Sequence, residues 1–324
     1  MRVGVAGYGV VGRRTVAHLV ERADVDEVLV LSPAHPATSK KVRRVDEREL
    51  RAQAAVVVLT TPSPQQSPAA VLLGAGCHVV TTSDDCADVD ALIAMERAAQ
   101  QAERCLVVGA AASPGMTGLL GRLAASDLDS VDELHVTIHG TGGPACARQH
   151  HEALGSTSRN WYDGAWQERP GGTGRELCWF PDPIGAHDCY RAALPDPVLL
   201  HRSFPSASRI TARLTATRRD RLTARLPMLR RPHPEAREGG LRVEVRGHAG
   251  VSRDAVVLGV ACPLGAVAAA MASVAAAAAG GGRFPTGLVV LGDEALPTRD
   301  LARQVAGAGV AIHRFTGTAS QTSW

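Results

Sequence analysis

Three glycines directly after the first predicted strand constrain the fold of this chain most tightly. The opening residues MRVGVAGYGVVG run from a short apolar strand into a G-x-G-x-x-G turn, which opens an amphipathic helix. In such a unit the first glycine permits a tight turn, the second lets a pyrophosphate approach the backbone, and the third allows close helix–strand packing. The pattern predicts a dinucleotide-binding turn, with a glycine-rich turn that binds no ligand as the alternative. Its residues are Gly7, Tyr8, Gly9, Val10, Val11 and Gly12.

The first 125 residues alternate apolar strands with amphipathic segments of helix length, which is typical of a parallel sheet with crossover helices. The expected strands are 2–6, 27–31, 55–60, 78–82 and 105–109, and the expected helices are 11–22, 67–74 and 88–102. Ser67 and Pro68 predict an N-cap followed by a first-turn proline. We therefore expect an α/β fold in which residues 1–125 form a Rossmann-type, doubly wound NAD(P)-binding domain.

The pattern changes after residue 125. Residues 131–139, 209–217, 241–247 and 254–260 read as strands, the last two joined as a hairpin, and residues 140–205 show few periodic runs. These features predict a second α+β domain, residues 126–263, built on a largely antiparallel sheet for substrate binding and dimerisation. In residues 264–324 we expect helices at 264–279 and 299–306, strands at 287–291 and 310–315, and a return of the chain to the first domain.

The end of the second strand bears on the choice between NAD and NADP. An NAD site usually has a carboxylate there to accept from the ribose 2′-hydroxyl, but this chain has Ser32, with a basic run beginning at Lys40 soon after. A missing carboxylate beside cations favours the 2′-phosphate of NADP. We predict NADP as the cofactor, with NAD as the alternative if the basic run is only a solvated surface loop.

Hydroxyl-bearing residues follow the third and fourth strands. Ligands of open α/β sheets bind outside the carboxyl ends of the strands, so these residues are candidates for cofactor contact. Capping of the following helices is an equally good interpretation. The residues concerned are Thr60, Thr61, Pro62, Thr82 and Ser83.

Charge and composition exclude several classes of protein. The net charge is only +3, and the arginine-rich stretch 213–237 lacks the aromatic residues that base stacking needs, so we expect no nucleic-acid partner. The apolar run 264–279 is shorter than the ~20 residues of a membrane span. The seven cysteines are scattered without a C-x-x-C pair. We expect a cytoplasmic protein that binds no membrane and has neither a disulfide framework nor a zinc site.

Several longer motifs resemble the saccharopine dehydrogenase (saccharopine reductase)-like oxidoreductases over most of the chain. They are the opening glycine turn with its helix, LGAGCHVVTTS at 73–83, GAAASPGMT at 109–117, FPDPIG at 180–185, and PDP at 195–197 followed by Phe204-Pro205. The resemblance implies reversible hydride transfer between NAD(P) and the C–N bond of an opine-like secondary amine, made from an amino acid and a carbonyl compound.

Three positions depart from the pattern of the saccharopine-forming members. Asp84 stands where they have tyrosine, Ser113 where they have aspartate before the Pro-Gly, and Thr141 where they have the cysteine of Cys-Gly-Gly. We therefore expect the fold and cofactor to carry over, but not saccharopine itself as the substrate.

The densest polar cluster, residues 139–152, supplies candidates for the chemistry. Reduction of an imine needs a proton donor to nitrogen and cations for the substrate carboxylates. If 146–154 is a helix, Arg148 and Glu152 share one face, as do Cys146 and His150. Arg148 could clamp a carboxylate, or only pair with Glu152 on the helix surface.

Three residues are candidates for handling the proton. His150 or His151 could be the general acid near neutral pH, with a structural role for either as the alternative. Asp84 is a second candidate, although Asp84 and Asp85 could equally cap the next helix. Adjacent histidines cannot both ligate a metal from one helix face, so we predict no metal.

Together these features predict an NADP-preferring oxidoreductase that acts on an amino-acid-derived imine or secondary amine and forms a homodimer. Two alternatives stay open. One is an alcohol or aldehyde oxidoreductase similar to homoserine dehydrogenase, and the other is a cofactor-binding sensor without catalysis.

Overall fold

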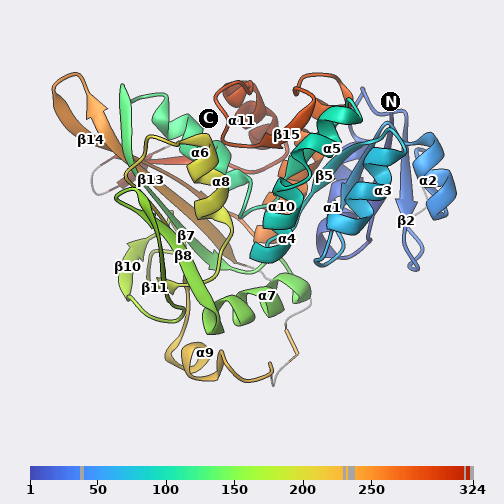
Figure 1. Ribbon diagram of the computed structural model, residues 1–324. Helices are drawn as coiled ribbons and strands as arrows, with labels where there is room; N and C mark the ends of the chain where they lie inside the picture. The colour runs from blue at the N-terminus through green and yellow to red at the C-terminus, as the bar shows by residue number, and fades with distance from the viewer. Residues whose placement is uncertain (37–39, 229–230, 233–237, 317–318, 322–324) are drawn as a thin grey trace. The chain divides into compact units, whose positions relative to one another are not determined.

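The computed structural model in Figure 1 describes residues 1–36, 40–228, 231–232, 238–316 and 319–321. The chain forms two compact units. Unit 1 comprises Met1–Gly115 and Gly265–Leu291, and unit 2 comprises Met116–Leu264 and Gly292–Trp324. Among the residues that the structure describes, none of the helices combines the length and apolar character needed to cross a membrane.

Unit 1 is built on a seven-stranded parallel sheet with the order β15-β6-β5-β4-β1-β2-β3. Most of its strands are continuous apolar runs, as expected for a parallel sheet covered on both faces. The order extends in both directions from β1, so a topological switch point lies between β1 and β4. The strands are β1 (Arg2–Ala6), β2 (Glu27–Leu31), β3 (Val42–Arg44), β4 (Val56–Leu59), β5 (His78–Thr81), β6 (Cys105–Val108) and β15 (Gly287–Val290).

The described residues of unit 1 form six helices, and Figure 1 shows most of them beside the blue-to-teal sheet. They are α1 (Val10–Val20), α2 (Glu47–Gln53), α3 (Gln66–Gly74), α4 (Cys86–Ile93), α5 (Glu96–Gln101) and α10 (Leu264–Gly280). The alanine-rich α10 is buried continuously from Val267 to Ala279, which agrees with its apolar character all round. The single helix predicted at 88–102 is instead the two helices α4 and α5; nothing in the local contacts explains the break.

The predicted Rossmann-type sheet is confirmed, but one strand and one helix beside it were not predicted. β3 has three residues, two of them arginines, and α2 buries only Leu50, so neither carries a clear apolar period. A capping box starts α2: Asp46 accepts from the backbone of Glu49, whose side chain accepts from the backbone of Asp46.

Unit 2 contains a mixed ten-stranded sheet with the order β10-β11-β12-β7-β13-β14-β16-β17, and β8 pairs with β12 and β9. Among the described strands of this second sheet, only β12 and β7 pair in parallel, so the predicted largely antiparallel sheet is confirmed. The predicted hairpin is also confirmed as β13 and β14, which turn at Gly250 with φ +61°. The strands introduced here are β7 (Ser130–Gly140), β12 (Arg209–Thr215), β13 (Gly239–Ala249), β14 (Ser252–Ala261), β16 (His313–Thr316) and β17 (Ala319–Gln321).

Residues 140–205 are more regular than the sequence suggested. They hold α7 (Pro144–Gly155), β8 (Thr157–Tyr162), β9 (Ala165–Pro170), β10 (Glu176–Trp179), β11 (Ala186–Arg191) and α8 (Asp196–Ser203). β9 has no buried residue and is held by backbone pairing to β8, so an apolar pattern could not reveal it. The other helices of unit 2 are α6 (Met116–Ala125), α9 (Arg218–Thr223) and α11 (Thr298–Gly307).

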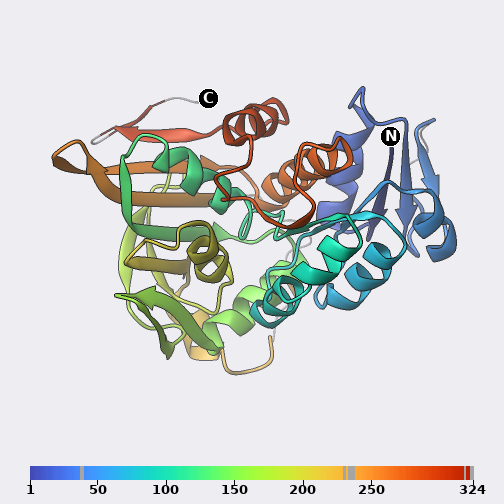
Figure 2. The same ribbon diagram turned by 45° about the horizontal axis from the view of Figure 1, so that its top comes forward.

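The division into units differs from the predicted domains at two places. The first boundary lies at Gly115 and not at residue 125, because α6 packs on β13 and β14. In the described part of the chain, α10 and β15 return to unit 1, where β15 pairs with β6, and α11, β16 and β17 belong to unit 2. Figure 2 shows the red C-terminal strand beside the orange β13–β14 hairpin, where β16 pairs with β14. Strand and helix periods do not specify which sheet an element joins.

Candidate functional site

The glycine turn after β1 is held by a side chain from β4's carboxyl end. Gly7 has φ +105°, a backbone conformation that favours glycine, and its N–H donates to the carbonyl of Leu31. The hydroxyl of Thr60 donates to the carbonyl oxygens of Ala6 and Gly7, each at 3.1 Å. A Cβ on Gly7 would lie 2.8 Å from Thr60 Oγ1, so both the conformation and the packing require glycine here.

Among the described residues, no side chain caps the amino terminus of α1. Gly9 is its N-cap, and its first turn contains no acidic residue. A Cβ on Gly9 would meet nothing within 4 Å, whereas one on Gly12 would overlap the carbonyl oxygen of Gly7. Val10 and Val11 begin the helix, and the half-buried Tyr8 lies in the turn. This end of α1 presents free space and backbone N–H dipoles, which suits an anion.

The amino termini of α2, α3 and α4 are occupied by carboxylates. Asp46 caps α2 and Asp85 caps α4, each accepting a backbone N–H. Asp88 from α4 reaches α3, where its two oxygens accept from the backbone of Gln65 at 2.8 Å and Gln66 at 3.0 Å. The N-cap of α3 is therefore Gln65 and not Ser67, which corrects the sequence prediction. Asp85 is the cap of α4, so Asp84 is not needed for that role.

A cavity of about 720 Å³ opens at the carboxyl ends of β1 to β4. It brings together three of the predicted cofactor residues, Gly7, Ser32 and Thr61. Its remaining lining is Ala6, Leu31, Pro33, Arg44, Val45, Asp46, Glu47 and Glu49. The position matches the rule that open α/β sheets bind ligands outside the carboxyl ends of their strands, near the switch point.

Lys40, a predicted cofactor residue, lies near the amino-terminal ends of the strands and not near their carboxyl ends, where the cavity is. It directly precedes Lys41, whose carbonyl accepts from Val28 near the start of β2. The cation that lines the cavity is Arg44, at the carboxyl end of β3, and its Nε donates to the carbonyl of Ser32 at 3.0 Å. β3 runs parallel to β2 and its last residue, Arg44, pairs with Val30 near the end of β2, so Lys40, which precedes β3, does not line this cavity.

The hydroxyls after β4 and β5 bind neighbouring loops and do not cap helices. Thr82 Oγ1 donates to the carbonyl of Leu59 at 2.9 Å, and its backbone N–H donates to Gln65 Oε1 at 3.0 Å. Ser83 and Ser63 hydroxyls lie 2.7 Å apart. Pro62 is exposed between the two strand ends. These contacts fix the loops at the carboxyl edge next to β1.

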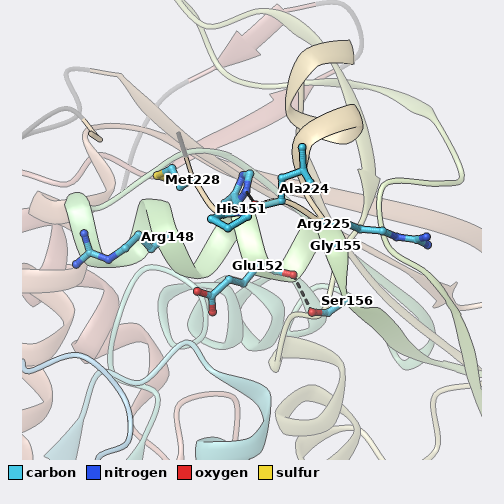
Figure 3. Close-up of a pocket in the computed structure, with 10 residues that line it drawn as sticks. Arg148, His151, Glu152, Gly155, Ser156, Ala224, Arg225 and Met228 are labelled. Atoms are coloured by element: carbon cyan, nitrogen blue, oxygen red, sulfur yellow. Dashed lines mark hydrogen bonds between the residues drawn. The ribbon is translucent and has the colours of Figure 1, made fainter. Parts of the chain in front are cut away.

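In unit 2, the exposed side of α7 lines a second cavity of about 690 Å³ (Figure 3). The helix considered at 146–154 is present within α7, and it places Arg148, His151 and Glu152 on this cavity opposite residues 224–228. His151 Nε2 lies 2.8 Å from the carbonyl oxygen of Leu226 and donates to it. Figure 3 shows the charged groups of Arg148 and Glu152 pointing in different directions.

His150 is buried on another side of α7. Its exposed fraction is 6%, its Nε2 lies 3.6 Å from Cys146 Sγ, and the backbone of Gly140 accepts a hydrogen bond from the ring. Burial lowers the pKa of His150 to about 4. The ring is therefore neutral at pH 7, which does not fit the expected role of general acid near neutral pH. Of the candidates for the proton, Asp84 belongs to unit 1 and His151 to unit 2.

A small aromatic group at the end of β7 contains a histidine that sequence reasoning did not select. The ring of His139 lies 4.3 Å from that of His187 on β11 and 5.7 Å from that of Phe180, centroid to centroid. Burial, and then the nearby His187, lower the pKa of His139. His187 carries no sequence signal, because it meets His139 only through the fold of the sheet.

Described arginines in the stretch 213–237 are partly engaged within unit 2. Arg213 Nη1 donates to the carbonyl of Gly174 at 2.6 Å and its Nε pairs with Glu176 at 2.8 Å. The guanidinium of Arg221 lies 4.2 Å from the ring centroid of Tyr190. Residues 229–230 and 233–237 of this stretch lie outside the described residues.

Comparison with known proteins identifies the fold. No protein-family model matches the chain, and no curated protein is significantly similar to it in sequence. Among solved structures it is similar to saccharopine dehydrogenase (L-Glu forming) from Saccharomyces cerevisiae, with a TM-score of 0.71 and 14% identity over 97% of this chain and 100% of that chain.

Two further solved structures are similar over most of the chain. The C. glutamicum DAP dehydrogenase in complex with DAP has a TM-score of 0.53 and 14% identity, covering 90% of this chain and 93% of that one. An engineered D-amino acid dehydrogenase bound to NADP+ has a TM-score of 0.52 and 14% identity, with the same coverage. The chain has the fold of these dehydrogenases, and the fold implied by the sequence resemblance is confirmed.

Proposed function

We propose that this chain is an NAD(P)-dependent oxidoreductase, with NADP preferred, that acts on the C–N bond of an amino-acid-derived imine or secondary amine. The open amino terminus of α1 is the observation that carries the proposal. The amino termini of α2, α3 and α4 each hold a protein carboxylate, whereas that of α1 begins at a glycine with free space beside it. A dinucleotide pyrophosphate supplies the anion that such an end favours.

The residues around the turn suit such a cofactor. Gly9 and the first amides of α1 would bind the pyrophosphate, and Thr60 keeps the turn in place through Gly7. Ser32 and Thr61 line the adjoining cavity, where an adenosine ribose binds in dinucleotide folds. When bound, the nicotinamide supplies or accepts a hydride at the substrate carbon. We assign this binding to unit 1 and substrate binding to unit 2.

On the substrate side, this chain's residues must bind a carboxylate and place a proton on nitrogen. The guanidinium of Arg148 lies on the wall of the unit 2 cavity, and a guanidinium binds a carboxylate through two parallel hydrogen bonds. The imidazole of His151 on the same wall, or the Asp84 carboxyl, would give the proton to the imine nitrogen and take it back in the reverse direction. The amino-acid substrates named for the similar structures support this substrate class.

Cofactor titration followed by turnover tests the proposal. We expect NADPH to raise the melting temperature of the purified chain and to quench its tryptophan fluorescence, and NADH to do so more weakly. A panel of 2-keto acids paired with amino acids should then oxidise NADPH. If neither nucleotide binds, the proposal fails.

The same experiment separates the alternatives. Turnover with alcohols or aldehydes, and none with the amine panel, would favour an enzyme similar to homoserine dehydrogenase. Tight NADPH binding without turnover of any panel member would favour the non-catalytic sensor. Asp84, Ser113 and Thr141, where the sequence departs from the saccharopine-forming pattern, are the residues that make this outcome worth testing.

A further inference from the structure

The strand β10 at one edge of the second sheet carries two exposed apolar side chains. It pairs with β11, and none of the other described strands pairs with its outer edge (Figure 1). Leu177 is 59% exposed and Trp179 is 62% exposed, whereas Cys178 between them is buried. Native proteins commonly protect a sheet edge with outward charges, which prevent pairing with another strand. A leucine and a tryptophan at this edge leave it without that protection.

The register of β10 shows which backbone groups face the open edge. Phe180 continues the pairing with β11, and its N–H donates to the carbonyl of Gly185 at 2.9 Å. Because alternate residues of an antiparallel pair exchange such bonds, the even-numbered residues of β10 bond to β11. The N–H and C=O groups of Leu177 and Trp179 therefore point away from β11, towards the open edge.

Arg175, directly before β10, is a third outward side chain. Its Nε pairs with Asp188 of β11 at 2.8 Å, and Asp188 lies opposite Leu177 in the register. Arg175 therefore shares the outer face of the sheet with Leu177 and Trp179. A guanidinium is attracted to the face of an indole ring, but four residues of strand separate Arg175 from Trp179 by about 13 Å. A second strand that runs antiparallel brings the two side-chain types together.

We propose that β10 pairs antiparallel with β10 of a second copy of this chain, about a two-fold axis at Leu177, and that this edge forms a homodimer contact. Leu177 then faces the partner's Leu177, and Arg175 faces the partner's Trp179 on either side of the axis. The residues that meet are those whose N–H and C=O groups point outward, so the two strands exchange backbone hydrogen bonds. An axis at Cys178 would instead join backbone groups that already bond to β11.

A second copy is favoured because the edge is complementary to itself. A two-fold contact joins one surface patch to the same patch, and here each copy supplies one guanidinium and one indole. Asp188 balances the charge of Arg175 within each copy. Because β10 has only four residues, the contact is small, and we expect the dimer to dissociate on dilution into the micromolar range. The contact goes beyond the proposed function and does not depend on cofactor binding.

Sedimentation velocity of the full chain over a range of concentrations measures the dimer. Leu177→Arg places two like charges at the axis, and Trp179→Ser removes the ring that faces Arg175. The matched control is Val251→Arg, because Val251 is a fully exposed apolar residue in the turn between β13 and β14. All three side chains are exposed, so the melting temperatures of the variants should match that of the wild type.

We expect the dissociation constant of the dimer to rise about tenfold or more in Leu177→Arg and about fivefold or more in Trp179→Ser. Val251→Arg should leave it within about twofold of the wild type. Leu177→Cys gives a second readout, because two thiols at the axis lie opposite each other. Oxidised glutathione should therefore join two Leu177→Cys chains by a disulfide, and should not join Val251→Cys chains.

Three results would overturn the contact. One is a wild-type chain that stays monomeric at about 100 µM. Another is a Leu177→Arg variant that dimerises as the wild type does, because the dimer would then use a different surface. The third is a Leu177→Cys chain that dimerises without forming the disulfide, which rules out an axis at this residue.

Discussion

The hydroxyl oxygen of Thr60 lies 3.1 Å from the carbonyl oxygen of Gly7, so a side chain at the end of β4 fixes the turn that follows β1. The two strands are neighbours at the switch point of the sheet. The same hydroxyl is within 3.1 Å of the carbonyl of Ala6, and a Cβ on Gly12 would lie 2.7 Å from it. Thr60 is therefore a positioning residue for the start of α1.

Replacing Thr60 by valine keeps the shape of the side chain and removes its hydrogen bonds to Ala6 and Gly7. We expect the free energy of unfolding to fall by about 1 kcal/mol, the net worth of such a bond, and NADPH affinity to fall with it. Thr60→Ser keeps the hydroxyl and is the matched control. Urea unfolding and NADPH titration check both effects; a valine variant that binds NADPH as the wild type does would show that the turn needs no support from β4.

Gly9 and Gly12 should respond to alanine in opposite ways. Alanine at Gly12 forces a Cβ against the carbonyl of Gly7, so the melting temperature should fall by several degrees, and NADPH binding should be lost. Alanine at Gly9 meets open space and a φ of −79° that it can adopt, so stability should hold while NADPH affinity drops by about tenfold or more. Unaltered affinity in Gly9→Ala would mean that no ligand approaches this backbone.

The parts of the site that the sequence predicts well come from local motifs and strand ends. Gly7, Ser32 and Thr61 fall on one cavity because parallel strands present their carboxyl ends at a common edge. That expectation needed only the strand boundaries and the order of a doubly wound sheet. α7 was only considered as a possible helix, because residues 140–205 show few periodic runs in the sequence.

Contacts between distant segments could not be predicted. Arg44, and not Lys40, is the cation at the cavity because Arg44 ends the short strand β3. β3 has no apolar period, so the sequence did not reveal this strand. Asp88, 22 residues after Gln66, caps α3, and no local signal connects the two. Burial of His150 rather than its neighbour His151 depends on which side of α7 packs, which the helical period alone does not determine.

Stability should fall with acid because of His150. Its pKa of about 4 in the folded chain lies below the value of 6.5 for a free imidazole, so between these values the unfolded chain takes up a proton that the folded ring does not. This contribution is complete above pH 6.5 and is lost as the pH falls towards 4, to about 3 kcal/mol in total.

Unfolding free energies measured from pH 7.5 to 4 should therefore decrease more steeply in the wild type than in His150→Asn, with parallel curves above pH 7. Ring proton shifts of His150 followed by NMR give an independent check that does not depend on the variant folding well. A ring that titrates near pH 6.5 would contradict the burial of this side chain.

Arg148 gives the sharpest test of the unit 2 cavity as the substrate pocket. If its guanidinium binds a substrate carboxylate, Arg148→Ala should raise KM for the keto acid or amino acid by about ten- to a hundredfold, because a charged hydrogen-bond pair is lost. The dissociation constant for NADPH should stay unchanged, since the cofactor residues belong to unit 1.

Glu152→Gln, on the same wall, is the matched control and should leave KM unchanged or lower it, because it removes a like charge near the incoming carboxylate. Equal KM values for Arg148→Ala and the wild type would remove this arginine from the site and place the carboxylate elsewhere in the chain.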